Sequence, residues 1–222
     1  MELANYKKVA LAIIIIIFIV GLYELLSLSN FNISTIEPLK ETTYVVLMGD
    51  SIFDNKEYAT SSVEMLLKKK HKKTLIIAKD GATIKDISKQ INQIPIYYDK
   101  AKTKLIISVG GNDLLNQYVY HKQDYKNLDA IFEAYKSCID KIKKLNYEVV
   151  LCNIYYPPYK KIKPYHKFIK EWNERLYKYA NKNKLEVLKI DDVLTQKAHF
   201  SNYIEPSTMG GKQIVNKITN LN

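Results

Sequence analysis

Five short runs of apolar, mostly β-branched residues divide the larger part of this chain into segments of comparable length. Each run has few polar interruptions, which is typical of strands that are buried on both faces of a parallel sheet. We therefore predict strands at 44–48, 74–78, 104–109, 148–154 and 186–190.

Apolar residues recur at helical spacing between these runs and after the last one. We predict helices around 57–70, 83–93, 124–145, 167–183 and 208–220. Strands that alternate with helices favour a parallel sheet covered on both faces. The predicted fold is a three-layer α/β/α sandwich of flavodoxin-like type, with a five-stranded, mostly parallel sheet. Functional residues of such folds lie beyond the carboxyl ends of the strands.

A further apolar run, Val9 to Tyr23, precedes the predicted domain and continues to Leu28 with one acidic interruption. Residues 9–28 reach the ~20 helical residues that a bilayer core requires. Lys7 and Lys8 precede this run, which predicts a cytosolic N-terminus and a lumenal or extracellular domain. The alternative is a signal peptide that is cleaved to release a secreted protein.

These patterns predict the organisation of the whole chain. Residues 1–8 form a short cytosolic segment, 9–28 a transmembrane signal anchor, 29–42 a polar linker and 43–222 one α/β domain. Hydrophobic residues make up 47% of the chain and charged residues 26%, so we expect a packed core rather than disorder.

Charge and cysteine content narrow the possible partners. The net charge of +11 comes from lysines scattered along the chain, which favours a solvated surface, and no nucleic-acid-binding motif accompanies it. Cys138 and Cys152 are the only cysteines, and they lack the spacing of metal ligands. Buried free thiols are favoured over a disulfide, and no metal site is predicted.

Candidate chemistry follows the first three predicted strands. Ser51 comes directly after the first strand, Gly81 lies in the loop after the second, and Asn112 follows the third. A serine at a strand-to-helix turn is exposed, and its N–H lies at a helix N-terminus. Together with a glycine N–H and a carboxamide, that N–H can surround the oxyanion of an acyl-transfer reaction. The spacing therefore predicts acyl-transfer chemistry at this edge of the sheet.

Three segments around these residues resemble the SGNH/GDSL hydrolase family. VVLMGDSI at 45–52, AKDGATIKDI at 78–87 and IISVGGNDLL at 106–115 are similar to its Ser, Gly and Asn blocks. The resemblance implies a nucleophile at Ser51 and oxyanion donors from the Ser51 N–H, the Gly81 N–H and the Asn112 side chain. It also implies hydrolysis of a small-molecule, lipid or glycan ester without a cofactor.

The last block departs from the family pattern of Asp-x-x-His, because this chain has Asn202-x-x-Glu205. In one interpretation Glu205 is the general base and Asn202 orients it; in a second, His199 is the base. In a third, catalysis is weak or lost, and the domain binds a glycan or a lipid headgroup. A flavodoxin-like nucleotide site is less favoured, since no glycine-rich phosphate loop follows the first strand.

Overall fold

The computed structural model describes residues 43–120 and 126–221. The predicted anchor at 9–28 and the linker at 29–42 lie outside these ranges, so both stay predictions. Within the described ranges, no helix combines the length and the apolar character that a membrane span requires.

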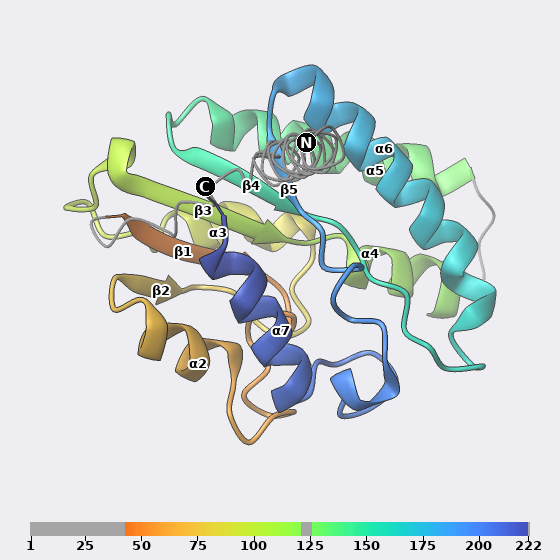
Figure 1. The fold of residues 1–222 in the computed structure, drawn as a ribbon. Coiled ribbons are helices and arrows are strands. Elements are labelled where there is room, and N and C mark those ends of the chain that lie inside the picture. Colours follow the sequence, from red (N-terminus) through yellow and green to blue (C-terminus); the bar gives the residue numbers. More distant parts are fainter. Residues whose placement is uncertain (1–42, 121–125, 222) are drawn as a thin grey trace, which may run out of the picture. The chain divides into compact units, whose positions relative to one another are not determined.

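A five-stranded sheet with the order β2-β1-β3-β4-β5 forms the centre of the domain, and every pair of neighbouring strands is parallel (Figure 1). Its strands are β1 (Tyr44–Gly49), β2 (Thr74–Ile76), β3 (Thr103–Ser108), β4 (Glu148–Cys152) and β5 (Glu186–Leu188). The predicted parallel sheet is therefore confirmed. The chain extends the sheet from β1 in both directions, so the strand order reverses between β1 and β3. Such a switch point is where doubly wound sheets open a crevice for ligands.

Helices cover both faces of the sheet. They are α2 (Val63–Lys70), α3 (Ile87–Ile91), α4 (Gly111–Leu115), α5 (Lys126–Lys143), α6 (His166–Asn183) and α7 (Thr208–Thr219). Alternate residues of β1 point to opposite faces: Val46 and Met48 pack with residues of α5 and α6, whereas Val45 and Leu47 pack with residues of α2 and α7. This alternation produces the predicted three layers (Figure 1).

Short turns connect these helices to the strands. Four are 3₁₀ turns, η1 (Ile84–Asp86), η2 (Lys100–Lys102), η4 (Lys163–Tyr165) and η5 (Lys197–His199), and η3 (Asn116–Tyr120) is a π-helical turn. The pattern of apolar residues did not predict η3. π-turns are rare and occur often at functional sites, and this one follows α4 directly.

Several predicted boundaries were wrong, and in two of them local hydrogen bonds explain why the element begins later or ends earlier than predicted. The helix predicted from residue 57 begins only at Val63, where the Ser62 hydroxyl accepts from the Met65 N–H at 3.2 Å and caps the helix. The strand predicted over 74–78 ends at Ile76, because the next two N–H groups, of Ile77 and Ala78, both donate to the Leu47 carbonyl.

Both cysteines have free thiols. Cys138 is half-buried on α5, and Cys152 is buried at the end of β4. Burial raises the pKa of both thiols, so neither is poised to react as a thiolate.

Gly49, at the end of β1, allows the close approach of two strands. Its φ is +122°, and a Cβ there would lie 1.7 Å from the Ser108 carbonyl oxygen. We expect Gly49→Ala to lower the free energy of unfolding by about 3 kcal/mol or more, from backbone strain and overpacking together. Urea denaturation followed by circular dichroism measures this loss.

Gly81 provides the matched control, because its φ is also positive, +74°, but no heavy atom lies within 4 Å of its Cβ position. Gly81→Ala should therefore cost only the backbone term of about 1–2 kcal/mol. Equal losses in the two variants would show that the contact with Ser108 does not constrain Gly49.

Candidate active site

Three of the predicted site residues line one pocket at the carboxyl edge of the sheet. Ser51 follows β1, Asn112 lies in α4 after β3, and Glu205 lies in the loop before α7. The pocket has a volume of about 780 Å³, its open mouth included. Gly81 does not line the pocket but is adjacent to it, since the Asn112 amide donates to the carbonyl of the next residue, Ala82, at 2.9 Å.

The turn that carries Ser51 is held by a buried glutamine. The Gln90 side chain accepts from the Gly49 N–H at 2.7 Å and donates to the Gly49 carbonyl at 2.8 Å. The Asp50 N–H donates to the Ser108 carbonyl at 3.1 Å, so the backbone is fixed on both sides of Gly49. These bonds place Ser51 at the pocket without using its own N–H.

Three N–H groups are the candidate oxyanion donors, those of Ser51, Gly81 and the Asn112 side chain. No backbone carbonyl of the described residues accepts from the N–H of Ser51 or of Gly81. The Asn112 amide has two hydrogens, and its bond to the Ala82 carbonyl uses one of them. These are the three groups that the resemblance assigned to the oxyanion, and that role stays a prediction.

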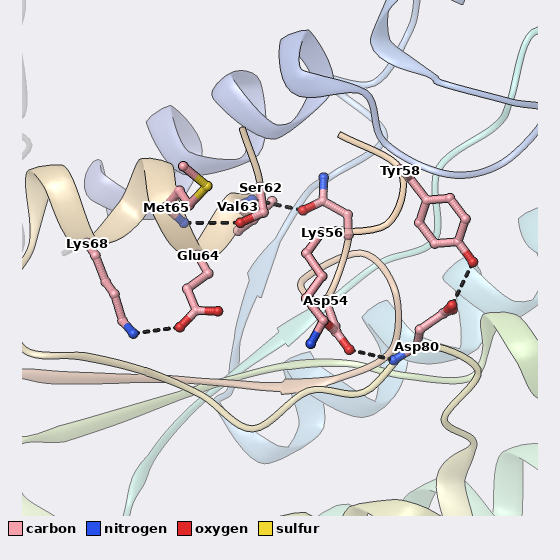
Figure 2. Close-up of polar contacts among 10 residues, drawn as sticks. Asp54, Lys56, Tyr58, Ser62, Val63, Glu64, Met65, Lys68 and Asp80 are labelled. Atoms are coloured by element: carbon pink, nitrogen blue, oxygen red, sulfur yellow. Dashed lines mark hydrogen bonds and ion pairs between the residues drawn. The ribbon is translucent and has the colours of Figure 1, made fainter. Parts of the chain in front are cut away.

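The loop that carries Gly81 is tied to the segment after Ser51. Figure 2 shows the Tyr58 hydroxyl donating to the Asp80 carboxylate at 2.6 Å, and the Asp80 N–H donating to the Asp54 carboxylate at 3.1 Å. These bonds join the loops after β1 and β2, which keeps the Gly81 N–H in a defined position relative to Ser51.

The loop that carries Glu205 is fixed through its backbone. The Asn202 side-chain oxygen accepts from the N–H groups of Ile204 and Glu205, both at 2.9 Å. The Tyr155 hydroxyl donates to the Ile204 carbonyl, and the Asn55 amide donates to the Pro206 carbonyl at 3.1 Å. The Asn202 side chain therefore orients the backbone of this turn, whereas we had predicted that it would orient the Glu205 side chain.

The Glu205 side chain is buried and close to Ser51. Burial raises the pKa of its carboxyl above the ordinary glutamate value, although a hydrogen bond with the Ser51 side chain lowers it in part. Its Oε2 is buried and has no hydrogen-bond partner among the described residues. A buried carboxylate with few donors holds a proton more strongly than one in water.

A second buried carboxyl, Asp50, lies beside Ser51 in the same pocket. Burial raises its pKa to about 7, hydrogen bonds from the Ile52 N–H and the Ser108 hydroxyl lower it in part, and the Glu205 charge raises it. Asp50 is therefore mostly protonated below pH 7.

Asp50 should make stability fall as the pH rises. Its pKa is about 7 in the folded chain and ~3.9 in an unfolded one, so the folded state holds the extra proton between these values. The stability from Asp50 is complete below pH ~4 and is lost as the pH rises through 7, by about 4 kcal/mol. Asp50→Asn keeps the oxygen that accepts from Ile52 and Ser108 and removes the ionisation.

Urea unfolding at several pH values between 4 and 8 tests this expectation. The difference in unfolding free energy between Asp50→Asn and the wild type should grow with pH, and Glu57→Gln, at an exposed carboxyl, should show no such trend. A constant difference would mean that Asp50 ionises normally in the folded protein.

His199, the alternative base, lies outside the pocket. Its ring is buried, and Nδ1 accepts from the N–H groups of Thr195 at 3.2 Å and Gln196 at 3.3 Å. It is not among the residues that line the pocket around Ser51. The ring therefore caps its own turn, which is a structural role.

Sequence reasoning missed several residues that shape the site. Asp50 stands directly before Ser51, and a carboxyl next to a predicted nucleophile was a signal that could have found it. Gln90 and Asn55 carry no such signal, because their contacts join segments that are remote in the chain. Within the described residues, no group of three His, Cys, Asp or Glu side chains gathers as metal ligands would.

A doubly wound parallel sheet with a serine after its first strand and amide donors beside it defines a class of hydrolases that carry the site at the sheet edge. The chain belongs to the GDSL-like lipase/acylhydrolase family, whose sequence profile matches residues 45–195. The matched region contains Ser51, Gly81 and Asn112 and ends before Glu205. No curated protein matches the sequence.

Solved structures share the fold at low sequence identity. A member of the lipolytic G-D-S-L family from Veillonella parvula has a TM-score of 0.64 at 14% identity, covering 79% of this chain and 95% of its own. A GDSL-like lipase from Bacteroides thetaiotaomicron has a TM-score of 0.60 at 18% identity, covering 82% and 88%. A variant of an acetyl xylan esterase from Geobacillus stearothermophilus has a TM-score of 0.59 at 15% identity, covering 82% and 98%.

Proposed function

We propose that the protein hydrolyses carboxylic esters, with Ser51 as the nucleophile and Glu205 as the general base. The Ser51 and Glu205 side chains line the same pocket, and the Ser51 side chain is near enough to lower the pKa of the Glu205 carboxyl, which supports this proposal most directly. A nucleophile and a base within hydrogen-bond reach of each other are the signature of covalent catalysis. Membership of an acylhydrolase family supports the same reaction class.

The reaction proceeds in two transfers of the acyl group. The Ser51 oxygen attacks the ester carbonyl carbon while Glu205 takes the hydroxyl proton. The resulting oxyanion is stabilised by the N–H groups of Ser51 and Gly81 and by the Asn112 amide. The tetrahedral intermediate then expels the alcohol, which receives the proton from Glu205, and an acyl ester of Ser51 remains. Water attacks that ester, giving its proton to Glu205, and the acid leaves as Ser51 regains a proton.

A glutamate is a weaker base than the usual histidine by about two pKa units, or roughly 3 kcal/mol in proton affinity. Burial of Glu205 raises its pKa and so narrows this difference. Asp50 is protonated below pH 7 and therefore adds no second negative charge beside Ser51 under those conditions. Acid–base catalysis commonly uses two carboxyl groups whose surroundings give them different pKa values, so that one is protonated while the other is ionised.

Covalent labelling tests whether Ser51 is a nucleophile. A fluorophosphonate should form an adduct with the full chain, and mass spectrometry of the digested protein should locate that adduct on Ser51. Ser108 is a control within the same protein, because it lines the same pocket but donates to Asp50. Labelling of Ser108 alone, or no labelling together with no hydrolysis of short-chain aryl esters from pH 6 to 9, would refute the proposal.

A further inference from the structure

One half of the pocket consists of apolar side chains, and we call it the apolar slot. Its wall includes Leu114, Leu115, Tyr118, Ile162, Phe168 and Ile169. These residues come from two separate parts of the chain: α4 and η3 on one side, and the segment around η4 and the start of α6 on the other. The slot adjoins Ser51 because Ser51 lines the same pocket.

The inner wall of the slot is packed and shielded from solvent. Leu114 is 5% exposed, and Phe168 and Ile169 are each 9% exposed. The rings of Tyr118 and Phe168 stack across the two sides at a centroid distance of 3.7 Å and an interplanar angle of 10°. This contact joins η3 to α6, so the slot is a built feature of the fold rather than a gap between loops.

Charge is confined to the catalytic end of the pocket. Among the described residues that line it, Asp50 and Glu205 are the only acidic or basic side chains, and both lie at the Ser51 end. A sugar placed in the slot would lose water from its hydroxyls without finding charged partners, which is unfavourable. An alkyl chain gains from burial, and each methylene is worth about fourfold in binding.

We propose that the apolar slot binds the acyl chain of the substrate, and that this chain is a linear aliphatic chain longer than acetyl. The inference rests on the proposed function, because it takes Ser51 as the point of attack. The alcohol must leave, and water must enter, before the acyl chain is released. An acyl chain held in the slot leaves the mouth of the pocket free for both steps.

Chain-length dependence of hydrolysis tests the slot. With p-nitrophenyl acetate, butyrate, hexanoate and octanoate below their micelle concentrations, kcat/KM should rise about fourfold per methylene until the slot is filled. Leu115→Gln, which places an amide in the slot wall, should reduce the octanoate-to-acetate ratio roughly tenfold. Leu145→Gln, at an exposed leucine after α5, is the matched control and should leave the ratio unchanged.

A binding measurement separates failure of the slot from failure of the proposed function. Methyl esters from acetate to octanoate are titrated into Ser51→Ala full-length protein by calorimetry, where no turnover is needed. Affinity that rises with chain length supports the slot even if the wild type hydrolyses nothing, in which case only the proposed function fails. Equal affinity for all esters would overturn the proposal that the slot binds the acyl chain. So would an octanoate-to-acetate ratio of kcat/KM that Leu115→Gln leaves unchanged.

Discussion

Replacement of Ser51 by alanine is expected to lower kcat for ester hydrolysis by roughly 10⁴- to 10⁶-fold. Removal of a serine nucleophile costs this much in other hydrolases, and the residual rate comes from the remaining oxyanion donors and from binding. Alanine keeps the backbone N–H of residue 51, so the oxyanion donors stay in place. Steady-state kinetics with an aryl ester, together with loss of fluorophosphonate labelling, measures the effect.

Ser61→Ala is the matched control for this substitution, because Ser61 lies in the same segment after β1 and, among the described residues, its side chain has no hydrogen bond, while its backbone N–H donates to Thr208. The control should hydrolyse esters at the wild-type rate. If Ser51→Ala keeps activity within tenfold of the wild type, Ser51 is not the nucleophile and the pocket has a non-catalytic role.

Glu205→Gln is expected to lower kcat/KM by about 10²- to 10⁴-fold, the usual contribution of a general base. Glutamine preserves the volume of the side chain, and the loop should keep its shape because Asn202 bonds to the backbone there. Only the ionised carboxyl accepts a proton, so wild-type activity should rise with pH through the Glu205 pKa, which burial raises above the ordinary glutamate value. The glutamine variant should lack this rise.

His199→Asn is the control that separates the two candidate bases. The asparagine oxygen can replace Nδ1 as the acceptor for the N–H groups of Thr195 and Gln196, so the turn should survive. Its kcat/KM should stay within a few fold of the wild type. Loss of activity in His199→Asn with retention in Glu205→Gln would reverse the assignment of the base.

Strand positions were predicted well because burial on both faces of a parallel sheet leaves a continuous apolar run. All five predicted strands exist, and β1 extends over Tyr44–Gly49, one residue beyond its predicted end. Boundaries that a single polar group sets, such as the start of α2 at the Ser62 cap, were harder to predict from the sequence. A cap is a local hydrogen bond, and a serine before an apolar run does not reveal which turn it will close.

The positions of Ser51 and Asn112 in one pocket followed from strand order, since the carboxyl ends of adjacent parallel strands lie together. The placement of Glu205 depended on a different signal, the proline and the glycines that follow it in the sequence. The role of Asn202 was misjudged because its side-chain oxygen bonds to the nearest N–H groups, those of Ile204 and Glu205. Local turn bonds of this kind compete with side-chain contacts at longer range.

By itself, the sequence determined the alternation of strands and helices, the resemblance to a hydrolase family and the residue types that follow each strand. Tertiary structure alone decided the proton affinity of Asp50 and Glu205, the exclusion of His199 from the pocket and the apolar slot. The physical reason is that periodicity and spacing act along the chain, whereas desolvation and cavity shape depend on which remote segments pack together. The stacking of Tyr118 on Phe168 is such a contact, and no spacing in the sequence specifies it.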